Sequence, residues 1–233
     1  TLTNNVMFNG PRAGVNFLDG FGGGNNIKGN LLFNWVRETG DHGPFNSWDR
    51  MPYLTTVRTG EPSVIPATTN ITRNFIINSY DSTWPLDHDD GSSFYEDTYN
   101  FLVYGGYKNY LGNSKNVHDN IYVLPDSRSS GGGQCVEDVG VGENSGWGEQ
   151  WYNNTCIFAG PNAGVYSSAD DHKLAAGGNV YMTKSGNVTM QVGSVEEIEL
   201  EEAQKTLGFD LGSVLEEFPS NNEIIKMGRD MLF

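Results

Sequence analysis

The stretch Asn26-Ile27-Lys28-Gly29-Asn30-Leu31-Leu32-Phe33 sets a pattern that recurs along the chain. An asparagine opens a short segment, a second asparagine closes it, and an apolar run follows. Similar asparagine-bounded units occupy residues 5–9, 70–74 and 116–120. Asn5 lies 21 residues before Asn26, and Asn70 lies 44 residues after it. Steps of this size are typical of solenoids, in which each repeat forms one coil.

The apolar runs are too short for helices and fit short β-strands. They occupy residues 31–33, 75–77, 101–104 and 121–124, each bounded by Gly, Asn or Pro. The 30 glycines and the charged fraction of only 18% also suit many short strands joined by tight turns. We therefore predict an all-β fold, a parallel β-helix in which asparagine side chains bond from coil to coil along the turns.

A longer repeat supports this architecture. The segment FNGPRAGVN at residues 8–16 recurs as FAGPNAGVY at residues 158–166, with six of nine positions identical. This repeat predicts the same turn-and-strand unit at both ends of the chain. We expect residues 1–193 to form the β-helix, with inserted loops near 51–69, which holds three prolines, and near 125–151, which holds Ser-Ser-Gly-Gly-Gly.

Residues 194–233 differ in character and predict a short helical C-terminal cap. Ser194-Val195-Glu196-Glu197 and Ser220-Asn221-Asn222-Glu223 both match a helix capping box. We predict two short helices, the first ending at Gly208, which cover the last coil of the solenoid. At the other end, Asn4-Asn5-Val6 already belongs to a repeat. We therefore expect an upstream domain or a partner chain to cover the N-terminal coil.

The chemistry of the chain is concentrated in Gly40 to Arg50, GDHGPFNSWDR, and in Asp87 to Ser93, DHDDGSS. If the chain winds as a solenoid, these two segments can meet as stacked turns. The candidate catalytic residues are Asp41, His42, Asp49, Asp89 and Asp90. The candidate substrate-binding residues are Arg37, Asn46, Trp48, Arg50, Trp84 and Lys108.

These segments, together with residues 9–16, 19–24 and 36–40, resemble right-handed parallel β-helix repeat proteins found among extracellular and carbohydrate-active proteins. The resemblance covers about the first 125 residues and implies a right-handed β-helix. Pectate and alginate lyases and polygalacturonases share that fold and supply an analogy. A lyase needs a basic proton abstractor, for which Arg37, Arg50 and Lys108 are of the right type. A polygalacturonase-like hydrolase needs three aspartates, for which Asp41, Asp89 and Asp90 are candidates.

Two functions follow from the acidic and aromatic residues. In the first, the protein binds or acts on a glycan in a cleft built from the turns at 41–50 and 87–95. Glycoside hydrolysis needs one protonated and one ionised carboxyl group, and Trp48 and Trp84 offer a surface on which sugar rings stack. If Asp89 and Asp90 lie on a strand, they point to opposite faces. If the protein is an enzyme, we expect it to be a glycoside hydrolase or a polysaccharide lyase.

The alternative is a non-catalytic structural or adhesive module of a larger extracellular assembly, with calcium as its cofactor. Asp87 and Asp89 are the candidate metal ligands, because alternating oxygen ligands before a glycine resemble a calcium loop. The segment departs from that loop because Gly91 comes one position early. An acidic turn exposed to solvent explains the same residues without a metal.

The net charge of −15 excludes a nucleic acid as the expected partner, because nucleic acid binding needs a basic surface. It favours a neutral or cationic ligand or a divalent cation. The sequence also lacks an apolar run long enough to span a bilayer, so we expect no membrane insertion. A polysaccharide or other glycan remains the expected partner.

An extracellular or secreted location is predicted by two further features. Cys135 and Cys156 are the only cysteines and lie 21 residues apart, which allows one disulfide. Three sequons place candidate N-glycosylation sites at Asn70, Asn153 and Asn187.

Overall fold

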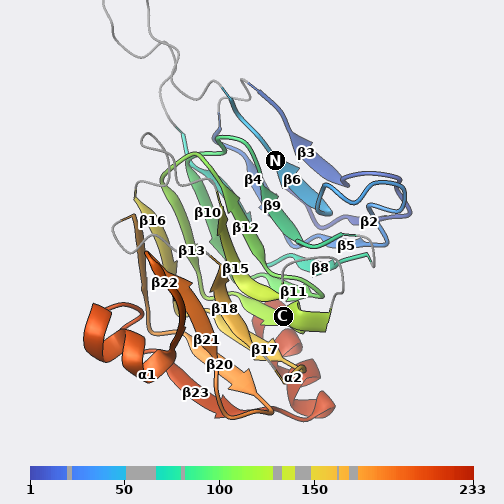
Figure 1. The fold of residues 1–233 in the computed structure, drawn as a ribbon. Coiled ribbons are helices and arrows are strands. Elements are labelled where there is room, and N and C mark those ends of the chain that lie inside the picture. The colour runs from blue at the N-terminus through green and yellow to red at the C-terminus, as the bar shows by residue number, and fades with distance from the viewer. Residues whose placement is uncertain are drawn as a thin grey trace, which may run out of the picture.

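The chain folds into a parallel β-helix with three sheets and a helical C-terminal segment (Figure 1). The structure is a computed structural model. It describes residues 1–19, 23–50, 67–79, 82–127, 133–139, 148–161, 163–167 and 173–233, without the side chains of residues 138 and 139. Each coil contributes one strand to each sheet, so strands that neighbour in a sheet come from successive coils.

We name the sheets A, B and C in the order in which the chain visits them. Sheet A contains β1 (Leu2–Thr3), β4 (Asn26–Lys28), β7 (Thr69–Thr72), β10 (Tyr95–Thr98), β13 (Lys115–His118), β16 (Glu149–Tyr152) and β19 (Leu174–Gly177). Sheet B contains β2 (Val6–Phe8), β5 (Leu31–Phe33), β8 (Phe75–Ile77), β11 (Phe101–Val103), β14 (Ile121–Val123), β17 (Thr155–Phe158), β20 (Val180–Thr183) and β23 (Val214–Glu217).

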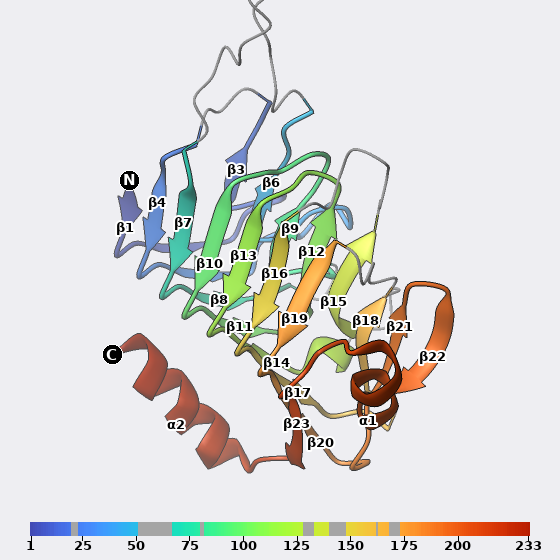
Figure 2. The ribbon, with the colours of Figure 1, turned by 90° about the vertical axis from the view of Figure 1, so that its left-hand side faces the viewer.

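Sheet C contains β3 (Val15–Phe17), β6 (Phe45–Ser47), β9 (Leu86–His88), β12 (Tyr107–Tyr110), β15 (Gln134–Val139), β18 (Gly164–Ser167), β21 (Thr189–Val192) and β22 (Val195–Glu199). Neighbouring strands pair in parallel within all three sheets, except that β22 pairs antiparallel to β21. The strands of sheet A lie side by side along the solenoid in Figure 2. The predicted all-β parallel β-helix is therefore confirmed.

The predicted strands at residues 31–33 and 75–77 match β5 and β8. The runs at 101–104 and 121–124 form β11 and β14, each one residue shorter than predicted. The last residues, Tyr104 and Leu124, adopt positive φ angles of 66° and 56°. A left-handed backbone ends the strand and starts the turn toward sheet C.

A buried asparagine ladder runs along the corner between sheets A and B, as predicted. Each ladder asparagine donates its backbone N–H and, from Asn5 to Asn120, its amide to the Oδ1 of the next, at 2.9–3.1 Å. The ladder consists of Asn5, Asn30, Asn74, Asn100, Asn120, Asn154 and Asn179, and it ends on Ser213 and Asp210. These bonds satisfy backbone groups that the corner would otherwise leave buried and unpaired.

The asparagine-bounded units align in the ladder differently from the way the sequence repeat suggests. The closing asparagine is the ladder residue in three units, but in the first unit it is the opening one, Asn5. Asn26 and Asn70 instead pair side by side within sheet A, where their side chains bond to each other at 3.2 Å. The residue before each ladder position has a left-handed backbone, and these residues include Arg73 and Tyr99 as well as Gly29. The turn conformation is therefore shared although the residue type is not.

The other sequence predictions for the fold are partly wrong. Residues 125–151 are not one inserted loop, because they contain a 3₁₀ turn (Pro125–Ser127), β15 and the start of β16. The insertion near 51–69 falls largely on residues 51–66, outside the described residues, and β7 begins at Thr69. The repeated segment does build the same unit at both ends, since residues 8–16 and 158–166 each lead from sheet B to sheet C.

The β-helix also extends beyond residue 193. Residues 195–199 form β22 rather than the first turn of a helix, so the prediction that a helix begins at the capping box of Ser194 is wrong. The helix starts at α1 (Leu200–Glu202), continues as a π-helical turn (Ala203–Leu207) and ends at Gly208, as predicted. The second helix, α2 (Asn221–Leu232), starts at the capping box of Ser220 and Glu223 as predicted.

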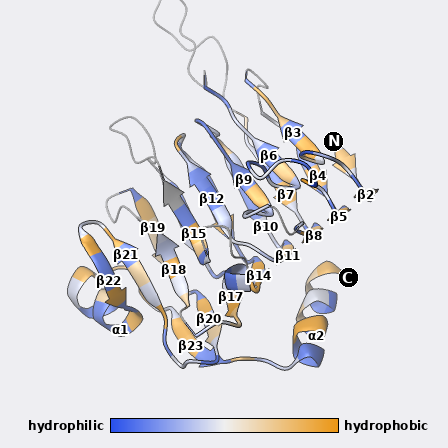
Figure 3. Cartoon of the chain, turned by 45° about the vertical axis from the view of Figure 1, so that its right-hand side comes forward, coloured by the Kyte–Doolittle hydropathy of each residue, from blue (hydrophilic) through white to orange (hydrophobic). Residues whose placement is uncertain are grey.

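Helix α2 does not cover the last coil. It lies along the outside of sheet B, and its C-terminal end points back toward the N-terminal coils (Figure 2). Its apolar residues pack against outward-facing residues of sheet B, namely Phe101, Ile121, Val123, Ile157 and Met182. Hydrophobic and hydrophilic residues occupy different sides of the helix (Figure 3), so the apolar side covers the sheet.

The predicted disulfide between Cys135 and Cys156 is formed and buried. It links β15 of sheet C to β17 of sheet B on successive coils, with the two Cα atoms 6.2 Å apart. It therefore crosses the interior of the solenoid. This bond agrees with an oxidising compartment.

Candidate functional site

The two polar segments meet on neighbouring coils of sheet C. Strand β6 pairs in parallel with β9, which places Asn46 beside Asp87 and Ser47 beside His88. The segments are about forty residues apart in the chain but adjacent in space. The predicted juxtaposition is therefore confirmed (Figure 1).

Alternation along these strands separates outward from inward residues. Phe45 and Leu86 point into the core. The residues that follow them, Asn46 and Asp87, lie on the outer face, in register with Lys108 of β12. Glu137 of β15 continues the row, because it pairs with Lys108. Four successive coils thus place a line of polar side chains on the outside of sheet C.

Lys108 lies between two carboxylates at the centre of this row. Its Nζ is 3.2 Å from Asp87 Oδ1 and 3.1 Å from Asp89 Oδ1. The Asp87 side chain is fully buried, that of Lys108 is 8% exposed, and that of Asp89 is 20% exposed. Asp89 is therefore the member of the trio that solvent reaches best.

Burial raises the pKa of Asp87 from 3.8 to about 7, against the opposing effect of Lys108. Burial lowers the pKa of Lys108, but the charges of Asp87 and Asp89 outweigh this effect and the net shift is upward. At neutral pH the cluster therefore holds a lysine cation, and Asp87 is close to its titration midpoint.

The side-chain amide of Asn46 lies 2.8 Å from Asp87 Oδ2. An amide oxygen accepts a bond from a protonated carboxyl group, whereas an amide NH2 donates to an ionised one. Asn46 can thus serve either protonation state of Asp87 by reversing its amide. On its other side it bonds to Asn16 at 3.0 Å.

Trp84 and Glu137 cover the cluster from the side of β15. Trp84 Nε1 donates to Glu137 Oε2 at 2.7 Å, and Lys108 Nζ lies 4.5 Å from the centre of a Trp84 ring. A cation over an indole face is an attractive contact. Burial raises the pKa of Glu137, although the Trp84 hydrogen bond partly opposes this.

Two glycines in the motifs are explained by close approaches of the chain. A Cβ at Gly43 would collide with the carbonyl oxygen of Trp84 and would lie 3.2 Å from the Cβ of Asp87. Gly91 has a φ of 80°, and a Cβ there would collide with the Asp49 carbonyl oxygen. Only glycine lets the two polar segments pack this closely.

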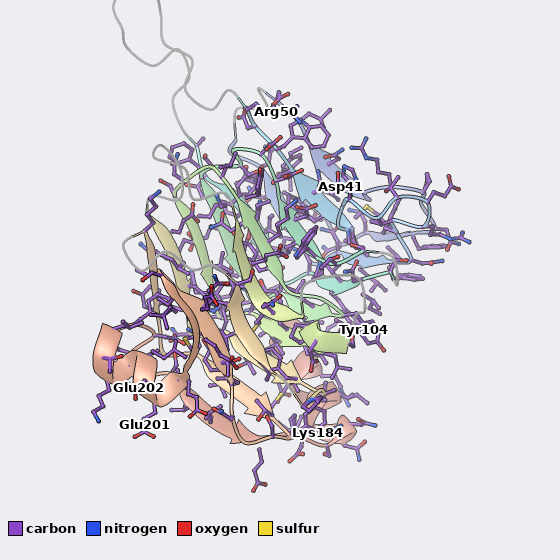
Figure 4. The ribbon with its side chains drawn as sticks, in the orientation of Figure 1. Asp41, Arg50, Tyr104, Lys184, Glu201 and Glu202 are labelled. Carbon is purple, nitrogen blue, oxygen red and sulfur yellow. A yellow bond between two sulfur atoms is a disulfide. The ribbon has the colours of Figure 1, made fainter. Side chains whose placement is uncertain are left out.

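His42 lies at the edge of the cluster, and Arg12 donates to its imidazole, with Nε 3.1 Å from Nε2. Burial and then Arg12 lower the pKa of His42, against the opposing charges of Asp41 and Asp89. The imidazole is therefore neutral at pH 7 and accepts from Arg12. Asp41, the residue before it, is exposed. Asp41 and Arg50 both lie near β6 in Figure 4.

Trp48 was predicted to stack on sugar rings, but arginines already contact it. The guanidinium carbons of Arg12 and Arg50 lie 5.6 and 5.7 Å from the centres of its rings. Arg50 also pairs with Asp90 at 3.0 Å and with Asp19 at 3.4 Å. The other predicted tryptophan, Trp84, contacts Lys108 of the cluster.

Not all predicted residues join the cluster. Asp49 lies near the buried Tyr95, whose phenol pKa is raised by burial and then by the charges of Asp97 and Asp49. Asp89 and Asp90 follow β9 instead of lying on it, so the expectation of opposite strand faces does not apply. Arg37 is exposed on the turn before β6, where its backbone N–H donates to Gly10.

A buried hydrogen-bonded network was not predicted from the sequence. Ser47 Oγ lies 2.7 Å from His88 Nδ1, and His88 Nε2 lies 2.7 Å from Asp97 Oδ2. All three side chains are buried, and Asp97 occupies a core position in register with Ile71 and Val117. The arrangement resembles a hydrolytic triad, but no substrate reaches it. It satisfies polar groups inside the solenoid. The sequence signal for this network is strand alternation. Because Asp87 faces outward, the next residue, His88, must face the interior.

Lysine takes the place that calcium would occupy between Asp87 and Asp89. Both predicted ligands direct an oxygen at Lys108 Nζ, and adding a divalent cation there would require the ammonium group to leave. Within the part of the chain that the structure describes, no three His, Cys, Asp or Glu side chains are grouped so that they could hold a metal ion.

The three sequons differ in their surroundings. Asn153 is exposed at the corner before β17, with a left-handed backbone. Asn70 lies within β7 and donates to Asn26, and Asn187 donates to Glu199 at 2.8 Å. Of the three sequon asparagines, Asn153 therefore has the side-chain amide that is least engaged by neighbouring residues.

Comparison of the chain with protein-family models, curated proteins and solved structures finds no match. Among the described residues, no helix has the length and apolar composition needed to cross a membrane. The site must therefore be interpreted from its own geometry.

Proposed function

We propose that this is an extracellular protein that binds a glycan on the outer face of sheet C and acts on it by acid–base chemistry. The observation that supports this proposal is the Asp87–Lys108–Asp89 cluster. Its buried carboxyl group, with a pKa near neutrality, lies beside a lysine and a more accessible carboxylate. Perturbed carboxyl groups of this kind are concentrated at functional sites.

Asp89 is the catalytic carboxylate of this proposal, because it is the exposed member of the cluster. Asp87 cannot touch a sugar, since its side chain is fully buried, so it acts as a positioning residue. When Asp87 is protonated and neutral, the ammonium group of Lys108 forms its ion pair with Asp89 alone. When Asp87 ionises above about pH 7, it competes with Asp89 for the same ammonium group.

A second carboxyl group is required for glycoside hydrolysis. Asp41 is the candidate, because it is exposed next to His42 and its charge acts on both His42 and Asp87. Trp84 supplies the nearest aromatic surface. The acidic surroundings of Asp41 and Asp89 favour neutral glycans over uronic acids, and hence hydrolysis over uronate elimination.

The proposal predicts that Asp89→Asn lowers turnover of a responsive polysaccharide by at least about 100-fold, the usual contribution of an acid–base group. Wild type and variants should be assayed for new reducing ends on a panel of neutral and acidic polysaccharides. Asp119→Asn is the matched control, because Asp119 also bonds to a basic side chain, that of His118, but lies on the corner between β13 and β14. It should retain wild-type turnover.

The melting temperature of Asp89→Asn should stay close to that of wild type, because Lys108 keeps Asp87 as a partner. A stable wild-type protein that neither binds nor cleaves any member of the panel would refute the proposal. So would equal losses of turnover in Asp89→Asn and Asp119→Asn.

A non-catalytic structural or adhesive module is the second candidate. It is favoured by the pairing of the basic residues around Trp48, since Arg50 bonds to two aspartates and Arg12 bonds to His42. Such a surface binds a glycan without chemistry. Glycan binding that survives in Asp89→Asn, with no products from wild type, would support this function.

A further inference from the structure

A buried asparagine, lysine and glutamate meet inside the solenoid, where the chain turns from sheet C to sheet A. Asn109 lies on β12, before the turn, and Lys115 opens β13, after it. Glu149 opens β16, the strand that pairs with β13 on the next coil (Figure 2). The Lys115 side chain is fully buried, that of Glu149 is 2% exposed, and Asn109 is 3% exposed.

Glu149 contacts both of the other side chains. Its Oε1 lies 3.0 Å from Lys115 Nζ, and the Asn109 side chain also hydrogen-bonds to it. An amine and a carboxamide are therefore held at one carboxyl group, away from water. Within the part of the chain that the structure describes, Asn109 Oδ1 accepts no hydrogen bond. A buried polar atom without a partner is uncommon and requires an explanation.

The other contacts of Lys115 suit a neutral amine as well as an ammonium group. Its Nζ donates to the carbonyl oxygens of Ser92 and Leu111 at 2.7 and 2.8 Å. An ammonium group has three N–H donors, and loss of one proton leaves two, enough for these two carbonyls. The lone pair then takes the third position, which faces Glu149 and therefore the carboxamide that Glu149 binds.

The surroundings favour transfer of a Lys115 proton to Glu149. Burial raises the pKa of Glu149, against the charge of Lys115 and the hydrogen bonds from Lys115 and Asn109. An ion pair in the interior carries a desolvation cost, which a neutral amine and a carboxylic acid avoid. Glu149 can therefore take a proton from the lysine and deliver it to the carboxamide as a general acid–base group.

We propose that the side chains of Lys115 and Asn109 become joined by an amide bond. Glu149 takes a proton from the ammonium group, and Nζ attacks Cγ of Asn109 to form the new C–N bond. Glu149 then gives its proton to Nδ2 and takes a second one from Nζ. The bond from Cγ to Nδ2 breaks, and ammonia leaves with the proton that Glu149 holds. The reaction consumes no oxidant, reductant or other reactant, and it ties β12 of sheet C covalently to β13 of sheet A.

Peptide mapping of the denatured and reduced wild-type protein by mass spectrometry tests this bond. Trypsin cleaves after a free lysine, so an unmodified Lys115 yields two peptides, 109–115 and 116–128. We expect instead one peptide of residues 109–128, lighter than its sequence mass by one ammonia molecule. Fragment ions should place the linkage between residues 109 and 115. Cyclisation of an asparagine to a succinimide loses the same mass but leaves Lys115 open to trypsin.

Two variants test the role of Glu149. Glu149→Gln should form the bond at least about 100-fold more slowly, because glutamine cannot carry the proton. Glu96→Gln is the matched control. Glu96 is also on sheet A and also contacts an asparagine and a basic side chain, those of Asn116 and His118, but it is 33% exposed. It should retain the wild-type peptide map.

The wild-type map decides the proposal even if Glu149→Gln does not fold. A wild-type protein that yields peptides 109–115 and 116–128 at their full sequence masses, without the linked peptide, overturns it. So does a linked peptide that forms equally fast in wild type and Glu149→Gln.

Discussion

At the residue scale, Asp87 shows how the fold alters a single carboxyl group. It lies on the outer face of sheet C, but its side chain is fully buried, and a Cβ at Gly43 of the neighbouring coil would lie only 3.2 Å from its Cβ. Burial raises its pKa to about 7, even though Lys108 lies 3.2 Å away. Desolvation of the carboxylate therefore outweighs the attraction of one cation.

This raised pKa makes folding stability depend on pH in a defined direction. The unfolded chain loses the Asp87 proton near pH 3.8, whereas the folded chain keeps it to about pH 7. The free energy of unfolding should therefore fall as pH rises between these values, by up to about 4 kcal/mol. Asp87→Asn removes the titrating group, so its stability should fall less over the same window.

Urea unfolding of wild type and Asp87→Asn between pH 4 and pH 8 measures this difference. Asp230→Asn is the control, since Asp230 forms an exposed ion pair with Lys226 on α2 and should leave the wild-type pH dependence unchanged. Parallel stability curves for wild type and Asp87→Asn would show that Asp87 titrates normally in the folded protein.

At the element scale, the asparagine ladder stabilises the corner between sheets A and B. Asn100 donates its backbone N–H and amide to Asn120, donates its amide also to the Ile71 carbonyl, and accepts from Asn74. Asn100→Ala would leave several buried groups unpaired and should cost about 3 kcal/mol or more. Asn26→Ala removes an exposed asparagine from β4 of sheet A and should change stability by at most about 0.5 kcal/mol.

Chemical denaturation of the two variants checks this prediction. Similar losses of stability in both would mean that the buried ladder contributes no more than an exposed asparagine pair.

Helix α2 offers a second test at this scale, because two adjacent isoleucines have different surroundings. Ile224 packs against the apolar residues of sheet B, whereas Ile225 is 60% exposed. Ile224→Asp should lower the free energy of unfolding by about 2–3 kcal/mol, since a charge would face an apolar surface. Ile225→Asp should change it by less than about 0.5 kcal/mol.

Thermal or urea unfolding distinguishes these outcomes. Equal effects of the two substitutions would mean that α2 does not rest on sheet B as described.

At the scale of the whole molecule, sequence periodicity was sufficient to predict the solenoid. Short apolar runs beside asparagine predict stacked strands, and β5 and β8 begin and end where expected. The register of the first unit was not predictable, because asparagine at positions 5 and 9 fits the pattern equally well. Positive φ angles at Arg73 and Tyr99 carry no sequence signal, since tertiary packing imposes them.

The candidate site was predictable to a similar extent. Both polar segments are recognisable in the sequence from their density of polar residues. Their stacking, which brings Asp87, Asp89 and His42 together, could therefore be predicted. Glu137 and Arg12 were missed, since each is a single residue contributed by a distant coil. The surroundings of Trp48 depend on Arg12 and Arg50, which are 38 residues apart in sequence, and no local pattern reveals the contact with Arg12.

The most direct test of the account is a carbon-13 NMR titration of the Asp87 side-chain carboxyl group in the folded protein, assigned with Asp87→Asn. The account predicts an apparent pKa near 7, because the buried carboxyl group keeps its proton beside Lys108. A resonance that titrates below about pH 5, as in an exposed aspartate, would contradict the proposed acid–base cluster on sheet C.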